Sequence, residues 1–328
     1  MDNLFNSDIT EVKEFIAVNI TNEFDTISPY LNNALEDVLP VLSPEMYAKL
    51  LGDYLAESTD EDHLALLRVT QRALVHFAYL RYQPFGSVQV TDRGLTQEKD
   101  QAMPFEQKMF SDSCRKEGYA ALNSMLKLLL ANRDVYTEWS GSGTYQELLA
   151  PMIHTVEEFS EFRVISGIDT LFALRPAIMH VQKKIIRANI GAELYDLLAE
   201  EVFEDDLSPD NKELLPYVKE ALAHLALEYG LPQLGWEMTS QGLRAITEKP
   251  IFRSGRNEER GDRFDTFAIG MDAKEKGELA LRELRKFLNK NASTSKYSSY
   301  FNDESLFEDG SPNPDLDQST GSFWAIRS

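Results

Sequence analysis

The two histidines that recur in this sequence are the first candidates for chemistry. His76 and His224 each lie beside the apolar stripe of a predicted long helix. A metal or acid–base site on a helix would need carboxylate or histidine neighbours three or four residues further on. Of those four positions only one, Glu228, holds such a residue. We therefore interpret both histidines as hydrogen-bonded side chains at a helix contact.

Cys114 is the only cysteine, so the chain has no intrachain disulfide and no cysteine-based zinc site. Arg115 and Lys116 follow it and would lower a thiol pKa, but no histidine partner is identifiable, which favours a structural cysteine. The sequence lacks the HExxH, GxSxG and Gly-rich phosphate-loop motifs, and its acidic runs lack EF-hand spacing. These observations predict no catalytic residue, no metal and no cofactor, hence a protein that is not an enzyme.

The charge balance is strongly acidic, with 33 basic against 54 acidic residues and a net charge of −21. Such a surface repels phosphate backbones and anionic membranes, which disfavours DNA wrapping and membrane binding. The chain has no apolar run of membrane-spanning length and no recognisable secretion signal. We therefore expect a soluble protein made in a reducing cytoplasm.

An internal repeat organises the chain. Residues 42–95 match residues 190–243 at 14 of 54 positions with an offset of 148 residues, where composition alone would give roughly three or four matches. Shorter matches extend the repeat, with an offset of 144 near Val12 and of 159 near Gly118. The offset rises twice along the chain, which indicates a small insertion of four residues and then a larger one in the second copy. Both halves are therefore predicted to share one fold.

Each copy is expected to be mainly helical with a short β element. Apolar residues at helical spacing predict a long helix ended by Pro84 and a final helix over residues 113–132. Between them, alternating residues 88–91 precede a glycine, which predicts a short strand. Helix starts are marked by capping boxes at Asp8 and Thr155, and by the pairs Ser28-Pro29, Ser43-Pro44 and Ser208-Pro209.

The predicted fold class is mainly α, as two tandem copies of a small helical-bundle module with an extended C-terminal arm. Residues 1–139 form the first repeat and residues 151–291 the second. Residues 140–150, with the run Ser-Gly-Ser-Gly, are expected to be a flexible linker. Residues 292–328 are polar and acidic, and we expect them to form the arm.

The candidate site residues are expected to bind partners, and none is predicted to be catalytic. A loop over residues 252–265 has no counterpart in the first copy, and its arginines would dock on an acidic surface or lie free in solvent. Aromatic residues of the arm would anchor it in a partner. The candidates are Arg253, Arg256, Arg260, Arg263, Phe301, Phe307, Phe323, Trp324 and Ile326.

The layout of ITEVKEFIAV, FDTISPYLNNALEDV, SPEMYAKLL and ALVHFAYLRY resembles the small helical adaptor proteins of tailed phages, the head–tail connector or head-completion family. In that family a short opening motif precedes helices in which small and aromatic residues alternate. The doubled form, with a strand before Gly-Leu and a late helix, is similar to an uncharacterised family of Bacteroidetes phages and prophages. The resemblance covers nearly the whole chain except the arm.

The resemblance implies a structural virion protein, made in the host cytoplasm, that forms a ring beneath the portal, extends the DNA channel and docks the tail. The implied partners are the portal protein and the tail or second connector proteins, and DNA would pass without specific binding. A ring of twelve copies is expected, with six as the alternative because the module is duplicated. Two other interpretations stay open, namely a cellular acidic two-module protein-binding scaffold and an enzyme that uses scattered carboxylates with a divalent metal.

Overall fold

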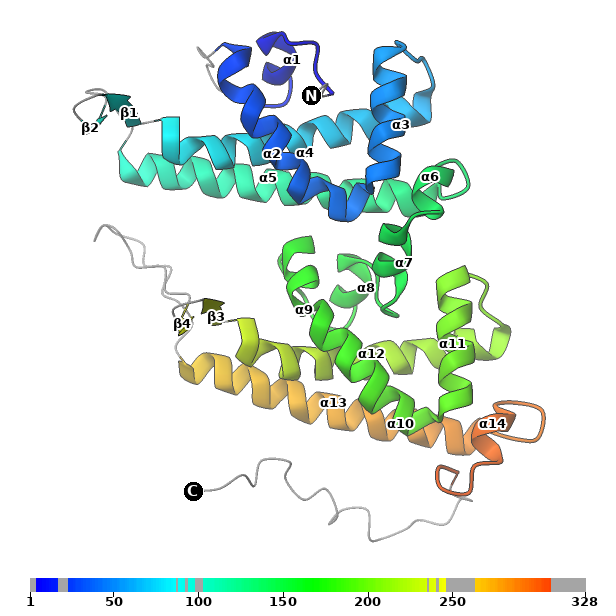
Figure 1. The fold of residues 1–328 in the computed structure, drawn as a ribbon. Helices are drawn as coiled ribbons and strands as arrows, with labels where there is room; N and C mark the ends of the chain where they lie inside the picture. Colours follow the sequence, from blue (N-terminus) through cyan, green and yellow to red (C-terminus); the bar gives the residue numbers. More distant parts are fainter. Residues whose placement is uncertain are drawn as a thin grey trace.

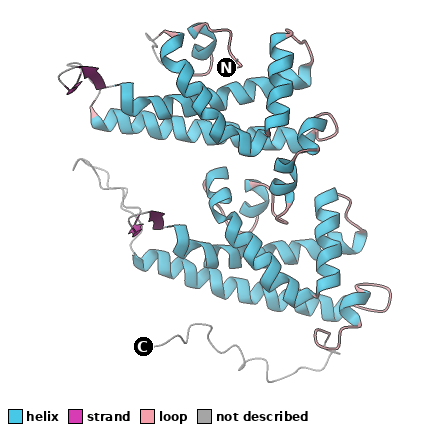
Figure 2. Ribbon diagram, in the orientation of Figure 1, coloured by secondary structure: helices cyan, strands magenta, loops and turns pink. Residues whose placement is uncertain are grey.

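The computed structural model describes residues 4–16, 23–86, 88–91, 94–97, 103–234, 236–239, 242–245 and 263–307. Within these ranges the chain is mainly helical, as the colours of Figure 2 show, and it forms two modules. The first module contains α1 (Ile9–Lys13), α2 (Phe24–Leu42), α3 (Pro44–Leu55), α4 (Glu61–Gly86), β1 (Val88–Thr91), β2 (Gly94–Gln97), α5 (Pro104–Ala131), α6 (Thr137–Ser140) and α7 (Gly143–Leu149).

The second module repeats this order with one interrupted helix. It contains α8 (Val156–Ser160), α9 (Ile168–Val181), the π-helix η1 (Gln182–Ile186), α10 (Arg187–Ile190), α11 (Ala192–Glu204), α12 (Pro209–Leu234), β3 (Trp236–Thr239), β4 (Gly242–Ala245), α13 (Arg263–Asn291) and α14 (Ser298–Phe301). Among the described helices none is both long and apolar enough to cross a membrane.

The two modules correspond element by element. The offset of the central sequence match relates the starts of α3 and α11, of α4 and α12, and of the strands. The larger offset found near Gly118 relates the starts of α5 and α13. In Figure 1 the modules are stacked in the same orientation, with the strands on the left and α3 and α11 on the right. The tandem repetition predicted from the sequence is therefore present in the structure.

Each pair of strands forms an antiparallel hairpin after the long helix of its module. Val90 lies opposite Leu95 in the first hairpin, and Met238 lies opposite Leu243 in the second. The register is the same at all four pairs of positions, so the hairpins are equivalent parts of the two copies.

Each module has an apolar core around its long helix. In the first, α4 packs between α2 and α5 and buries Leu66, Leu74 and Ala78. In the second, α12 packs between α9 and α13 in the same way. Each fully buried leucine contributes roughly 2 kcal/mol, so these faces hold the helices together.

Two predicted helix boundaries are wrong because the burial of neighbouring residues stabilises the helix by more than the proline destabilises it. Helix α2 begins at Phe24, so Ser28-Pro29 lies inside it, and α4 continues past Pro84 to Gly86. A proline near a helix end removes a single main-chain hydrogen bond. Burial of Ile27 and Leu31 on both sides of Pro29 offsets that loss.

Two predicted caps are confirmed, and a third start is corrected. The Oγ of Ser43 accepts the N–H of Met46 at 3.2 Å, and the Oγ of Ser208 accepts the N–H of Asn211 at 3.4 Å. The final helix of the first copy, expected from residue 113, begins at Pro104. Its first turns are mostly exposed, and their apolar residues do not continue the core-facing stripe of the rest of the helix, so the pattern does not reveal them.

The predicted four-residue insertion lies inside a helix. Helix α2 has 19 residues, and its counterpart runs from Ile168 to Ile190 through α9, η1 and α10. Four residues exceed one α-helical turn of about 3.6 residues. The wider turn of η1 absorbs the difference, and both end residues of the helix, Ile168 and Ile190, are buried.

The segment expected to be a flexible linker is a helix instead. The Oγ of Ser142 accepts the N–H of Tyr145 at 3.1 Å and caps α7. Tyr145, Leu148 and Leu149 are buried in the first core. Serine and glycine are common at helix starts as well as in flexible linkers, and here they begin α7.

The predicted arm begins too early. Residues 292–307 pack on the second module, where Tyr297 and Tyr300 are buried. Residues 308–328 lie outside the described residues. The second module therefore extends at least to residue 307, as the first extends to residue 149.

Candidate functional site

A short aromatic segment closes the end of the first module. Tyr136 and Trp139, beside and within α6, are fully buried. The Tyr136 hydroxyl donates to the carbonyl of Asp62 at 2.8 Å, and the Trp139 Nε1 donates to the carbonyl of Val41 at 2.8 Å. The rings fill the core while their polar atoms are satisfied, which fixes α6 against the end of α2 and the start of α4.

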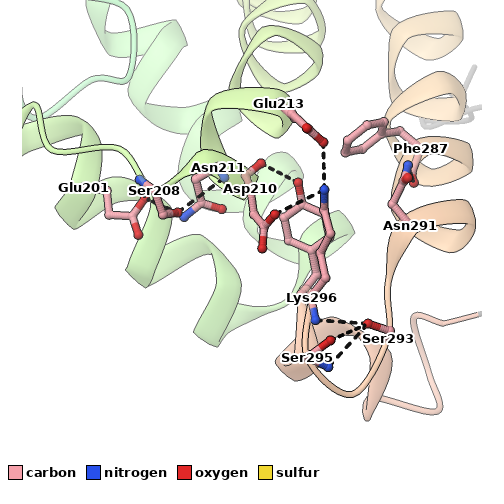
Figure 3. Close-up of polar contacts among 11 residues, drawn as sticks. Glu201, Ser208, Asp210, Asn211, Glu213, Phe287, Asn291, Ser293, Ser295 and Lys296 are labelled. Carbon is pink, nitrogen blue, oxygen red and sulfur yellow. Dashed lines mark hydrogen bonds and ion pairs between the residues drawn. The ribbon is translucent and has the colours of Figure 1, made fainter.

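The second module is closed in the same manner by the residues around α14. The Tyr297 hydroxyl donates to the carbonyl of Asp210, which is the counterpart of Asp62. Figure 3 shows Lys296 reaching the start of α12, where its Nζ lies 2.7 Å from Glu213 and 3.2 Å from Asp210. The hydrogen bond with Glu213 raises the pKa of Lys296. Residues 293–297 are therefore docked on α12.

Two aromatic residues predicted to bind a partner, Phe301 and Phe307, pack within this chain. Phe307 packs against the second core, and its ring centroid lies 4.7 Å from that of Phe301. Both side chains are therefore half-buried in their own module and do not lie on an extended arm, and their binding of a partner stays a prediction. Arg263 is the first residue of α13. The other candidates lie outside the described residues: Arg253, Arg256, Arg260, Phe323, Trp324 and Ile326.

The recurring histidines lie inside the two cores. His76 is 7% exposed and His224 is 6% exposed, and the Nδ1 atom of each has no hydrogen-bond partner. Burial lowers the pKa of both, so the neutral forms are favoured. Charged groups on the same helix and on neighbouring segments act on each histidine. These groups are Glu117 and Arg72 at His76, and Glu220, Lys276, Arg163 and Asp272 at His224.

Cys114 is buried against the core, and burial raises the pKa of its thiol to about 11. The neighbouring Arg115 and Lys116 do not offset this effect, so the thiol stays protonated near neutral pH. Within the described ranges no three His, Cys, Asp or Glu side chains gather as a group that could hold a metal ion.

The loop before the long helix differs between the modules. In the second module the Oε2 of Glu201 accepts the N–H of Ser208 at 3.0 Å and the Nδ2 of Asn211 at 2.7 Å (Figure 3). In the first module the counterparts of Glu201 and Asn211 are Asp53 and His63. The shorter Asp53 lies 3.2 Å from the Nδ1 of His63.

A hollow of about 270 Å³ lies between α3 and the start of α4 in the first module. Tyr54, His63 and Leu64 contribute to its lining, together with the acidic residues Asp53 and Glu57. The Nε2 of His63 has no hydrogen-bond partner. This surface is therefore apolar inside and acidic at its edge.

The modules contact each other through different faces. From the first module, Lys127 on α5 forms an ion pair with Glu157 of α8 at 3.0 Å. Tyr145 on α7 packs against Phe203 at the end of α11, with ring centroids 5.5 Å apart. Ile168 at the start of α9 is fully buried in the first core. The stack is therefore held by apolar contact as well as by exposed charges.

A buried glutamine of the π-helix holds the segment between the two modules on the second module. The Oε1 of Gln182 accepts the N–H of Met152 at 2.8 Å, and its Nε2 donates to the carbonyl of Ala150 at 3.0 Å and to the Tyr195 hydroxyl at 3.1 Å. Gln182 is 1% exposed. A fully bonded buried side chain of this kind fixes the path of the chain between the modules.

Exposed apolar side chains occur on the strand-bearing side of both modules. In the first they lie at the end of α4 and the start of α5, and in the second at the corresponding ends of α12 and α13. They are Phe85, Met103, Phe105, Met109, Tyr229, Ile269 and Met271. Exposed apolar residues that recur in one region are typical of contact with other proteins.

The sequence interpretation missed the aromatic pairs and Gln182. Tyr136 and Trp139 share their spacing of three residues with Tyr297 and Tyr300, and this match would have extended the repeat beyond residue 291. Gln182 gave no comparable signal, because two of its partners are main-chain atoms about 30 residues away.

Two stacked copies of one helical module define this chain as a tandem-repeat protein. Its sequence matches the model described as Family of unknown function (DUF6712) over residues 35–147 and 186–307, and the chain belongs to that family. The matched ranges include α6 and α14, so the family's repeat contains the aromatic closing segments. No curated protein and no solved structure matches the chain.

Proposed function

We propose that this chain is a structural virion protein of a tailed phage, a head–tail connector or adaptor that forms a ring beneath the portal. The contact between its two modules carries the proposal. One face of the first module meets a different face of the second, through pairs such as Lys127 with Glu157 and Tyr145 with Phe203. A contact between unlike faces can be repeated from copy to copy and generates rings when the rotation closes.

The strand-bearing side supports lateral assembly in such a ring. Exposed side chains such as Phe105 (63%) and Met271 (52%) lie on this side in both modules. The short β element of each module has two strands, and hairpin edges can pair with a neighbouring chain. Each copy would then offer its neighbours two equivalent contact regions.

The charge supports a channel role. A channel wall built from a protein of net charge −21 neutralises few DNA phosphates and therefore releases few counterions. DNA would slide through such a channel without specific binding. The ring would hold twelve copies, or six if the duplicated module imitates a twelvefold ring. Its partners would be the portal protein and the tail or second connector proteins.

Quantitative mass spectrometry of purified particles tests the proposal, by comparing the copy number of this chain with that of the portal protein. A ratio near one to one supports twelve copies, and a ratio near one to two supports six. Absence from particles refutes the connector and favours a cellular acidic two-module scaffold, which salt-sensitive binding of basic host proteins would then identify.

A further inference from the structure

The end of α11 in the second module is covered by side chains from the first. Phe203 packs on Tyr145, and the carboxylate of Asp205 forms an ion pair with Arg133. Phe203 also packs against the first core. An aromatic side chain thus packs on this end of α11, and an arginine pairs with the carboxylate of Asp205, whose side chain is 69% exposed.

The corresponding end of α3 is exposed. Leu55 is the counterpart of Phe203 and is 62% exposed, and Glu57 is the counterpart of Asp205 and is exposed too. The two acidic residues share a left-handed backbone, with φ of 51° and 56°, so the two helix ends are equivalent in shape. We name as the α3-end surface Leu55, Glu57 and the adjoining hollow lined by Tyr54, His63 and Leu64.

We infer that the α3-end surface binds residues 323–327 of a second copy of this chain. This segment has the sequence Phe-Trp-Ala-Ile-Arg. It supplies an aromatic group and an arginine, the two chemistries that Tyr145 and Arg133 supply at α11. The hollow, lined by leucines and Tyr54, suits the indole of Trp324.

Charge complementarity supports this occupant. Arg327 is the only residue with an ionisable side chain in residues 318–328. The α3-end surface presents the carboxylate of Glu57, with Asp53 at the hollow and Asp60 at the start of α4. An arginine beside these carboxylates forms a charge-assisted hydrogen bond, as Arg133 does with Asp205.

The tandem arrangement indicates why the segment comes from a second copy. By the spacing that relates Tyr136 to Tyr297, Leu306 is the counterpart of Tyr145. By the spacing that relates α5 to α13, Ala292 is the counterpart of Arg133. If a second copy continued the stack, Leu306 of one copy would lie beside α3 of the next copy. This contact would lack the aromatic group and the arginine. The chain between Phe307 and Phe323 spans up to about 50 Å when extended, so the segment that follows can supply both.

The contact joins unlike surfaces and therefore continues from copy to copy, as a closed ring or an open chain. It is a property of the purified protein and does not rest on the proposed place in a virion. Its failure would leave the particle measurement unaffected, and absence from particles would leave this contact intact.

Cross-linking between two tagged forms of the full chain tests the inference. One form carries Thr59→Cys beside the α3-end surface, and the other carries Ser322→Cys beside Phe323. Cys114 is buried and stays unreactive. With a short bis-maleimide the two forms should yield a mixed dimer. No mixed dimer is expected when Val164→Cys, at a position 84% exposed on the second module, is used in place of Thr59→Cys.

Sedimentation velocity gives the second readout. Trp324→Ala and Glu57→Lys should each weaken self-association about thirtyfold, the size expected for an anchor residue. Adding Arg327→Glu to Glu57→Lys should restore it, and Leu197→Glu, at an exposed position on α11, should leave it unchanged. The inference is wrong if no mixed dimer exceeds the Val164→Cys control, if cross-links form only within one chain, or if Trp324→Ala associates like the wild type.

Discussion

Two glycines in α13 should respond in opposite ways to the same substitution. A Cβ added at Gly277 would lie 2.6 Å from the Cδ2 and 3.3 Å from the main-chain nitrogen of Leu225 on α12. A Cβ at Gly270, seven residues earlier, would meet no atom within 4 Å. Gly277 therefore allows α12 and α13 to approach closely, whereas Gly270 does not contribute to packing.

The expected sizes follow from two opposing effects. Alanine is better than glycine in a helix by about 1 kcal/mol, so Gly270→Ala should raise the free energy of unfolding by that amount. At Gly277 the new methyl group is about 1 Å too close to Leu225, and overpacking typically costs about 1–3 kcal/mol. The net effect of Gly277→Ala should be a loss of up to about 2 kcal/mol.

Urea denaturation of the full chain, followed by circular dichroism in the far ultraviolet, measures both variants in one helix. Because both positions lie in α13, any separate unfolding of the modules affects them equally. Because the helix-propensity gain is common to both variants, the expected difference between them equals the overpacking cost of about 1–3 kcal/mol. If Gly277→Ala stabilises as much as Gly270→Ala, the close approach of α12 and α13 is refuted.

Three further predictions concern buried polar groups. Tyr136→Phe and Tyr297→Phe should each lower the free energy of unfolding by about 1 kcal/mol in urea denaturation, because a buried carbonyl loses its donor. Since burial lowers the pKa of His76 and His224 below 6.5, the unfolded chain binds protons that the native chain does not, and stability should fall from pH 7 to about pH 5.5. Changing both histidines to glutamine should reduce that slope in thermal melts at the two pH values, and an unchanged slope would contradict it. The thiol of Cys114 should react with a thiol reagent at about pH 8 only after denaturant is added, and rapid reaction of the native chain would disprove its burial.

The repeat and several helix starts could be predicted because they depend on local chemistry. Ser43 and Ser208 cap helices through their own side chains, and the recurring apolar residues have the period of a helix. The positions of Pro29 and Pro84 within helices could not be predicted in this way. Burial of residues from distant segments decides those boundaries, and the local pattern does not contain it.

The candidate site was harder to predict than the fold. Phe307 was expected to be free for a partner because the residues around it are polar. Its contacts with Phe301 and the second core come from chain folding back after α13, which composition does not indicate. The exposed end of α3 also became visible only by comparison with the covered end of α11.

The π-helical turn has a consequence for how the chain reaches its native state. Neighbouring domains of similar sequence are prone to exchange equivalent elements while they fold. The helix Ile168–Ile190 is four residues longer than α2, and the hydrogen bonds of Gln182 require Met152 and Tyr195. Neither helix therefore fits the place of the other, and the divergence of the two copies protects each newly made half from misassembly with its twin.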